Sequence, residues 1–426
     1  MIKELQIRPF SRPLLVWIAG IILQTAFPLY AYSVLFLLFP LLVLILSCFG
    51  TKERGVFCYE TRWLWGAVFV SLLLFLSIQK TACSQVDLSF EHSESTLSRL
   101  AKEEQLRLLE PFGRLNLTDE EKSVLATITV GYREAMDRNV RQRFSVAGVA
   151  HILAVSGFHV AVVCGFLSFL LSFLPRSEPC RWVRYLLTVL LLWLFVAVTG
   201  LAASAVRAAL MLTLFLTGGV LGRRAERYNI LAASAFCMLV YEPLYLFDIG
   251  FQLSYLAVLS ILYFQPRLQR LMKVRNPLLR APWQWITVTL AAQVGTVFLC
   301  LYYFGQFSTV FLLTNLPMTL LATLLIPMGL AWMLLPAGCP GYEWLQVGVE
   351  GLTHGLLRLV DSFSRVPGAV FSFRFDLFTM LVVYGMLLFV LLYGRSKRPA
   401  YLFAALALLL IILIVRLIGN LMLCGI

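Results

Sequence analysis

Polar side chains inside apolar stretches are the residues of this sequence that could do chemistry. The first group is the run His151-Ile-Leu-Ala-Val-Ser156-Gly157-Phe158-His159, which holds two of the four histidines. A continuous helix would place His151 and His159 on one face, beside Ser156 and Gly157. The spacing of eight residues is too long for both imidazoles to hold one metal ion. Two interpretations stay open: a functional site within the membrane, or hydrogen bonds that join helices.

Two further groups combine charge with small residues. Ser204-Ala-Val-Arg207 follows a run of small residues that allow close helix approach. The Arg207 guanidinium keeps its charge, so it needs water, an anion or a carboxylate as a partner. Asp248 and Gln252 lie one helical turn apart, with Ser254 close by. Asp248 suits two roles, partner of Arg207 and N-cap of a helix.

A fourth group forms a polar stripe with spacings of about four and seven residues. It consists of Glu343, Glu350, His354, Arg358, Asp361 and Arg365. Such a stripe suits a helix that lines an aqueous path or one that lies in the membrane interface. Upstream of it, Asn315-Leu-Pro317 predicts a broken helix, which is tolerated only where protein buries it or where it lines water.

The elements that must position these groups are apolar helices. The 426 residues are 60% hydrophobic and 13% charged, whereas soluble domains carry about 25% charged residues. An ordinary water-soluble enzyme is therefore excluded. Runs close to the length of a spanning helix, roughly 17–25 residues, occur at 13–29, 31–49, 63–79, 149–173, 185–199, 200–222, 228–247, 248–265, 283–303, 309–335, 344–364, 376–394 and 400–422. We expect an all-α polytopic membrane protein with about 11–13 transmembrane helices.

One polar insert interrupts the apolar sequence at residues 80–145, with ten basic and eleven acidic groups. Thr118 and Glu121 fit a capping box, which predicts the start of a helix. Apolar residues then recur at helical spacing as far as Phe144, and arginines collect near that end, where the helix dipole favours them. We expect one amphipathic helix that leads straight into the segment 149–173.

The distribution of Lys and Arg predicts the orientation. With the segments above, all basic clusters fall on one side of the membrane, at 3–12, 52–62, 176–184, 223–227, 267–280 and 395–398. The positive-inside rule then places the N-terminus in the cytoplasm. The insert and the C-terminus would lie outside.

The chain divides into four predicted parts: N-terminal transmembrane helices at 1–79, the extracytoplasmic insert at 80–145, a membrane core at 146–375 and C-terminal transmembrane helices at 376–426. The sequence contains neither a P-loop motif nor a C-x-x-C pair, so we expect no built-in ATPase, no metal and no cofactor. A serine hydrolase built on Ser156 and His159 would need a third group that the sequence does not reveal.

The run from His151 to His159 strongly resembles the H-L-L-A-[IV]-S-G-L-H signature of the ComEC family of competence proteins, with Phe158 in place of the usual Leu. Further matching stretches follow in the same order over roughly residues 115–375: Ser204-Ala-Val-Arg-Ala, Asp248-Ile-Gly-Phe-Gln-Leu-Ser-Tyr-Leu-Ala, and Phe304-Gly-Gln-Phe-Ser through Asn315-Leu-Pro. The resemblance implies an inner-membrane channel, not an enzyme, that passes single-stranded DNA into the cytoplasm during natural transformation.

Typical ComEC proteins also carry an external domain and often a C-terminal metallo-β-lactamase-like domain, and we expect neither in this sequence. The partners implied are single-stranded DNA, membrane lipid, a separate cytoplasmic motor ATPase and a separate nuclease, while a homo-oligomer stays open. The residues expected to line or shape the DNA path are His151, Ser156, Gly157, His159, Ser204, Arg207, Asp248, Gln252, Ser254, Asn315 and His354. The alternatives are a channel or transporter for another anionic solute, and an intramembrane hydrolase that uses Ser156 and His159.

Overall fold

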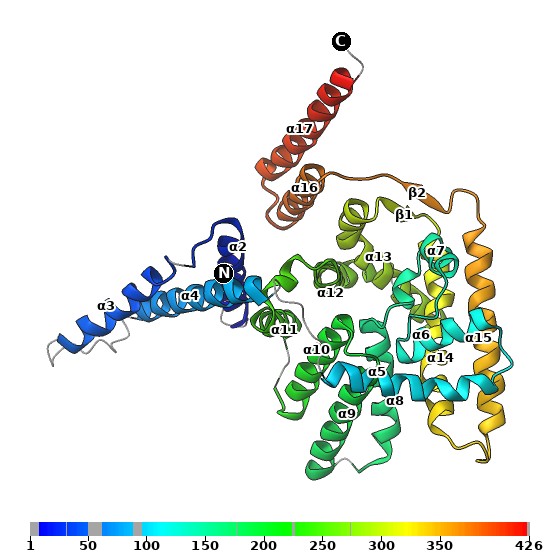
Figure 1. Ribbon diagram of the computed structural model, residues 1–426. Coiled ribbons are helices and arrows are strands. Elements are labelled where there is room, and N and C mark those ends of the chain that lie inside the picture. The colour runs from blue at the N-terminus through cyan, green and yellow to red at the C-terminus, as the bar shows by residue number, and fades with distance from the viewer. Residues whose placement is uncertain are drawn as a thin grey trace.

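The computed structural model describes residues 8–30, 32–49, 62–87, 96–175, 177–223, 226–272 and 274–423 (Figure 1). Several members of the predicted basic clusters, among them Lys3, Lys52, Arg54, Arg176, Arg224 and Lys273, lie outside the described residues. The elements are α2 (Ser11–Ala26), α3 (Leu35–Phe49), α4 (Arg62–Asp87), α5 (Thr96–Leu109), η2 (Glu110–Arg114), α6 (Asp119–Val130), α7 (Arg138–Val146), η3 (Ala150–Ile152), α8 (Gly157–Leu170), η4 (Leu171–Phe173), α9 (Glu178–Val198), α10 (Ala203–Val220), α11 (Arg227–Tyr241), η5 (Pro243–Phe247), α12 (Ile249–Gln269), α13 (Pro277–Tyr303), β1 (Gln306–Ser308), α14 (Phe311–Leu334), α15 (Tyr342–Ser364), β2 (Val370–Ser372), α16 (Leu377–Ser396) and α17 (Pro399–Leu423), where η marks short 3₁₀ helices.

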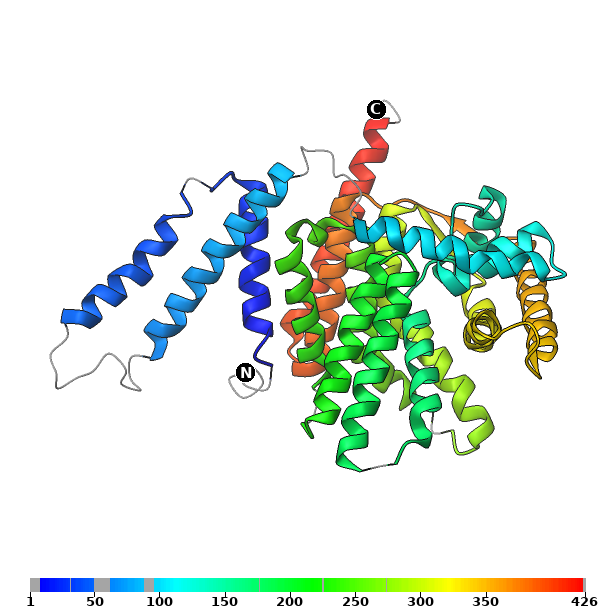
Figure 2. The ribbon, with the colours of Figure 1, turned by 60° about the horizontal axis from the view of Figure 1, so that its bottom comes forward.

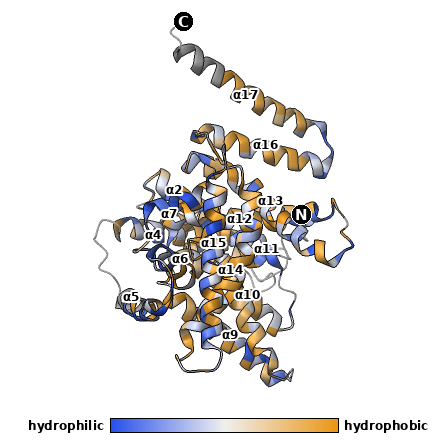
Figure 3. Ribbon diagram, turned by 90° about the vertical axis from the view of Figure 1, so that its right-hand side faces the viewer, coloured by the Kyte–Doolittle hydropathy of each residue, from blue (hydrophilic) through white to orange (hydrophobic). Residues whose placement is uncertain are grey.

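Apolar helices dominate the molecule, which confirms an all-α polytopic membrane protein. Within the described residues, seven helices are long and apolar enough to cross a membrane: α4, α9, α10, α12, α13, α14 and α16. Three shorter apolar helices lie at Ser11–Ala26, Gly157–Phe173 and Pro399–Val415. Three predicted spans are absent from these two sets. The span at 31–49 corresponds to α3, which has 15 residues, and the span at 228–247 to α11, which ends at Tyr241. The span at 344–364 corresponds to the polar α15. Figure 3 shows hydrophobic residues over most helices and hydrophilic stretches along α15.

The helices from α8 to α13 pack against one another in chain order with short connections, so they alternate in direction (Figure 2). The starts of α8, α10 and α12 therefore share one end of the bundle with the end of α13. We call this the motif end. The described residues of the connections at 174–177, 221–226 and 270–276 lie at the opposite end, as the predicted grouping of basic clusters requires. Arg8 joins the N-terminal segment to that opposite end through an ion pair with Glu226 at 3.2 Å.

The hairpin of α14 and α15 is closed at its base by a two-stranded antiparallel sheet. β1 immediately precedes α14 and β2 follows α15, with Gln306 opposite Ser372. The predicted break at Asn315-Leu-Pro317 is wrong, because α14 continues through Pro317. Neighbouring helices and side chains can satisfy the carbonyl that a proline leaves free in an apolar helix. α14 instead ends at Leu334, shortly before Pro336.

The capping box of the insert is confirmed, whereas its single helix is wrong. Thr118 Oγ1 accepts from the Glu121 amide at 3.3 Å, and the Glu121 carboxylate accepts from the Thr118 amide at 2.8 Å. However, α6 ends at Val130, its C-cap Gly131 adopts a left-handed φ of 77°, and α7 starts anew behind the N-cap Asp137. A Cβ at Gly131 would lie 2.8 Å from Cγ2 of Val155. The close approach of these two segments therefore requires glycine at this turn.

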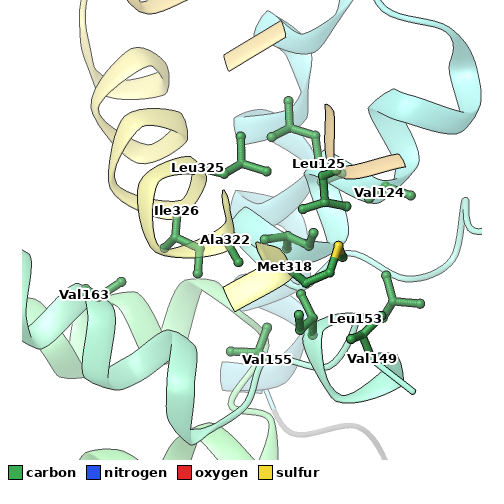
Figure 4. Close-up of a cluster of buried hydrophobic side chains, with 14 of the residues drawn as sticks. Val124, Leu125, Val149, Leu153, Val155, Val163, Met318, Ala322, Leu325 and Ile326 are labelled. Carbon is green, nitrogen blue, oxygen red and sulfur yellow. The ribbon is translucent and has the colours of Figure 1, made fainter. Parts of the chain in front are cut away.

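The largest cluster of buried apolar side chains lies where α6, η3, α8 and α14 meet (Figure 4). Val124 and Leu125 from α6 face Met318 and Ile326 from α14, and all four are fully buried. Part of the polar insert thus contributes directly to the core. α15 completes this unit with Val349, Leu356 and Val360, which are fully buried as well.

Candidate functional site

The first motif forms the start of α8. Ser156 is the N-cap in extended conformation, and Nδ1 of His159 accepts a hydrogen bond from the Ser156 amide at 3.3 Å. The same Nδ1 atom lies 3.1 Å from Oγ of Ser156. The imidazole is completely buried, and its Nε2 atom has no hydrogen-bond partner among the described residues. His159 therefore folds back on its own helix start and holds the Ser156 turn in place.

His151 lies on η3 and not on the helix of His159. The predicted common helical face is wrong, because the extended backbone at Ser156 ends one local helix and starts another. The turn instead brings His151 within hydrogen-bonding reach of Asn315 on α14. The His151 side chain is exposed.

Asn315 connects His151 to a further polar pair. Its Nδ2 atom donates to Thr289 Oγ1 of α13 at 2.7 Å. Its Oδ1 atom accepts from Thr319 Oγ1 at 3.3 Å. The Asn315 amide therefore links η3, α13 and α14 at this point of the chain.

The second motif packs directly on the first. Ser204 Oγ donates a hydrogen bond to the carbonyl of Val155, one residue before the N-cap of α8. A Cβ at Gly157 would meet the Cβ of Ala208 at 3.6 Å, an ordinary van der Waals contact. The small residues thus bring the starts of α8 and α10 together, as the sequence predicts.

The second and third motifs meet through an ion pair. Nη1 of Arg207 lies 3.9 Å from Oδ1 of Asp248, and the same oxygen accepts from the Phe251 amide at 2.7 Å. Asp248 therefore fills both of its predicted roles at once. The Arg207 side chain is 3% exposed and that of Asp248 49%.

The Arg207 guanidinium sits against the first turn of α12. A Cβ at Gly250 would lie 3.3 Å from its Nη2 atom. The positive end of the helix dipole disfavours a cation here, and the Asp248 carboxylate offsets that effect. The Nε and Nη1 atoms of Arg207 form no hydrogen bond with the described residues. These donors are buried and lack an acceptor among the described residues, although the guanidinium keeps its charge.

The remaining residues of the third motif hold the scaffold together. Gln252 Nε2 donates to the carbonyl of Leu246 at 3.0 Å, and Gln252 Oε1 accepts from the Tyr303 hydroxyl at 3.0 Å. Ser254 Oγ donates to the carbonyl of Phe251 within its own helix. Gln252 thus ties η5, α12 and α13 together, while the hydrogen bond of Ser254 is local to α12.

His354 lies apart from this group. Its Nδ1 atom is 2.6 Å from Oε1 of Glu121 on α6. Other members of the stripe also bind the insert, since Glu350 accepts from the Asn116 amide at 2.8 Å and Asp361 forms an ion pair with Arg143. The stripe on α15 therefore anchors the insert, which neither predicted role, an aqueous path or the membrane interface, anticipated.

These anchoring contacts shift the pKa values of the Glu121 carboxyl and the Arg143 guanidinium. Burial raises the pKa of the Glu121 carboxyl, but hydrogen bonds from His354 and Thr118 outweigh it, so the pKa falls below its ordinary value. Burial lowers the pKa of the Arg143 guanidinium, but bonds to Asp361 and Glu120 outweigh it and raise the pKa. Both groups are thus held in their charged forms.

Residues from all the matching stretches gather at the motif end: the starts of α8, α10 and α12, and the segment that follows α13. The sequence model of the family described as "Competence protein" matches residues 128–398, which contain all eleven predicted site residues. The chain belongs to this family.

One relative of this competence protein is ComE operon protein 3 from Bacillus subtilis (strain 168). The two sequences are 28% identical over 278 residues, which cover 63% of this chain and 34% of the relative. The match thus spans about a third of the relative's length. No solved structure matches the chain. The resemblance to the ComEC family is confirmed.

Sequence reasoning missed two arginines of this competence protein that lie near the motif end. Arg133 lies in the turn between α6 and α7, two residues after Gly131, which packs against Val155 just before the N-cap of α8. Arg141 on α7 donates from Nη2 to the carbonyl of Arg133 at 2.9 Å. The concentration of four arginines between residues 133 and 143 was the available signal. From the sequence, these arginines are explained by the dipole of a single helix, which favours cations at its C-terminal end, but the structure divides that helix into α6 and α7.

Proposed function

We propose that this competence protein is a channel, not an enzyme, that passes single-stranded DNA through the bacterial inner membrane into the cytoplasm during natural transformation. The observation that carries the proposal is the convergence of the signature residues of α8, α10 and α12 at one end of the bundle. Membership in the competence family supports the choice of DNA as the substrate.

A DNA strand carries one negative charge per nucleotide, which hydrocarbon cannot accept, so its path must be wet and must tolerate cations and anions. The exposed His151 and the unsatisfied donors of Arg207 suit such a path. Ser156, Gly157 and His159 shape its wall through the packed start of α8. In this proposal the positions of the neighbouring helices are fixed by Ser204, Asp248, Gln252, Ser254 and Asn315. His354 contributes indirectly, because it holds the insert in place.

The positive-inside rule gives the proposed direction of transport. The N-terminus and the basic connections face the cytoplasm, while the motif end and the insert face outward. Because the sequence holds no P-loop motif, the energy comes from a separate cytoplasmic motor ATPase, and a separate nuclease degrades the second strand. Membrane lipid surrounds the apolar helices in this arrangement, and the number of copies per channel stays open.

Deletion of the gene tests the proposal. DNA labelled on one strand is added to competent cells, and DNA bound at the surface is measured separately from DNA protected in the cytoplasm. We expect surface binding to persist and cytoplasmic uptake to fall to background, with recovery on complementation. Normal cytoplasmic uptake in the deletion strain contradicts the proposal. A loss confined to the flux of another anion would favour the alternative transporter.

The contact of 3.1 Å between Ser156 Oγ and His159 Nδ1 supports a second candidate, an intramembrane hydrolase. The same Nδ1 atom already accepts a hydrogen bond from the Ser156 amide. That contact competes with the role of a general base, so we rank the hydrolase second.

A further inference from the structure

An open groove runs between α7 and the two-stranded sheet at the motif end. Its volume is about 530 Å³, and its lining consists of Arg141, Gln142, Ser145, Val146, Gln306 and Val370. Two hydrogen bonds fix its walls to each other: Gln306 Nε2 donates to Ser145 Oγ at 3.2 Å, and Ser308 Oγ donates to the Val146 carbonyl at 2.8 Å. The groove is therefore a built feature of the fold.

Positive charge lies in and beside this groove, because Arg141 lines it and Arg133 adjoins Arg141. Arg141 contacts the backbone of Arg133, and neither guanidinium forms an ion pair among the described residues. Burial lowers the pKa of Arg133, and the nearby charge of Arg141 lowers it further. Arg143 differs, because Glu120 and Asp361 neutralise it. Two cations held close together without carboxylates favour the binding of an anion.

The two faces of the sheet decide which part of a ligand the groove can hold. Side chains alternate along a strand, so Val370 and Ser372 face α7 while Phe371 points to the opposite face. Phe371 stacks there with Phe373, with ring centroids 6.1 Å apart. No aromatic residue lines the groove. The lining thus suits phosphate oxygens and not the stacking of bases.

We propose that this groove binds the phosphate backbone of a single nucleic-acid strand through Arg141, which lines it, and Arg133, which lies beside Arg141. The inference rests on the proposed function and assigns a docking site to it. The planar guanidinium fork matches phosphate geometry. Arg133 follows Gly131, which packs against Val155 just before the N-cap of α8, so Arg133 adjoins the signature motif. Binding at this site is independent of base sequence and strongly dependent on salt.

The test uses the purified full chain in nanodiscs of zwitterionic lipid and a fluorescein-labelled oligothymidylate, with binding followed by anisotropy. The double variant R133Q/R141Q is compared with R280Q, which removes an exposed arginine at the opposite end of the bundle. We expect the double variant to bind at least tenfold more weakly and to lower the salt slope by about 1.4, at ~0.7 per phosphate contact of a single strand. R280Q should leave both quantities unchanged.

Further arms distinguish the sources of a phosphate ligand. Inorganic phosphate and phosphatidylglycerol vesicles replace the oligonucleotide with the same variants. Unchanged oligonucleotide binding in the double variant, or a loss limited to the vesicles, overturns the inference. R133K/R141K, which keeps both charges, should recover part of the affinity, and a normal size-exclusion profile shows that the variants fold.

Uptake in cells separates the two claims. If deletion of the gene abolishes uptake and the double variant restores it fully, the groove assignment fails and the proposed function stands. If deletion leaves uptake normal, the proposed function fails, and the nanodisc measurement alone decides whether the groove binds the strand. A reduced uptake by the double variant with normal protein level supports both.

Discussion

Nδ1 of His354 lies 2.6 Å from Oε1 of Glu121, a contact that joins the middle of α15 to the first turn of α6. The same carboxylate closes the capping box with Thr118. One nearly buried side chain thus starts a helix and fixes that helix to a neighbour 233 residues away in sequence. Its charged form therefore stabilises the folded state at two places.

Acid should weaken the attachment of α6. The pKa of Glu121 is lowered in the folded protein, so its stabilisation is present above the pKa of a free Glu, about 4.3, and is lost as the pH falls toward the folded value. We expect Glu121→Gln to unfold at a lower temperature at pH 7, with a loss of roughly 1–3 kcal/mol, and to lose less on acidification. Thermal unfolding in detergent between pH 7 and 3.5 measures this. Parallel curves for the two proteins would contradict it, and the exposed Glu103→Gln serves as the control.

The left-handed turn after α6 gives a steric prediction. Gly131 and Gly200 share a φ of 77°, but a Cβ at Gly131 would lie 2.8 Å from Val155, whereas Gly200 has nothing within 4 Å. Both changes to alanine should cost about 1 kcal/mol of backbone strain. Gly131→Ala should lose about 1–3 kcal/mol more from overpacking. Denaturant unfolding of the two variants checks the difference, and equal losses would refute it.

The role of Arg207 can be separated from its ion pair. Arg207→Gln should reduce cytoplasmic DNA uptake at least tenfold at a normal membrane level, because it removes the buried donors proposed for phosphate. Arg207→Lys keeps the charge but not the planar fork, so it should recover part of the uptake. Asp248→Asn removes the partner charge and can still cap α12. A similar loss in Asp248→Asn and Arg207→Gln would mean that the ion pair alone matters.

The hydroxyl of Ser156 should not be an activated nucleophile. We expect a fluorophosphonate probe to label the parent protein no more than Ser156→Ala, because the Ser156 amide occupies Nδ1 of His159. Loss of this N-cap should cost about 1 kcal/mol of stability. Labelling that disappears in Ser156→Ala would instead support the hydrolase.

Cysteine labelling checks the orientation. Two variants each introduce a cysteine, Gln142→Cys and Arg280→Cys. Gln142 lies on the exposed surface of α7, and Arg280 lies near the start of α13, at the opposite end of the bundle. In intact spheroplasts a membrane-impermeant maleimide should label the former and reach the latter only after permeabilisation. The signal of the unaltered chain is subtracted as background. The reverse pattern would invert the proposed topology.

Local signals in the sequence predicted several features correctly. The capping box of Thr118 and Glu121 depends on residues three positions apart, and the N-cap role of Asp248 depends on the turn that follows it. The pairing of Arg207 with Asp248 followed from the high cost of an unpaired charge in an apolar helix. The membrane class followed from composition alone.

Other features depend on contacts between distant residues. Apolar positions continue at helical spacing on both sides of Gly131, so periodicity gives no reason to end α6 there. The helix ends because the close contact with Val155 leaves no room for a Cβ at Gly131. The spacing of His151 and His159 predicted one helix, although Ser156 was an available N-cap signal. The stripe on α15 has partners more than 200 residues upstream, which no periodicity reveals.

The long sequence separation of these contacts has a consequence for biosynthesis. Asn116, Glu121 and Arg143 bind residues that are synthesised 218–234 positions later. At 5–20 residues per second, translation needs roughly 10–50 s to supply α15 after α6 has emerged. During this interval the nascent insert holds charged groups that water must solvate. We expect chains released before α15 is complete to lack this anchor and to be cleaved more readily by proteases.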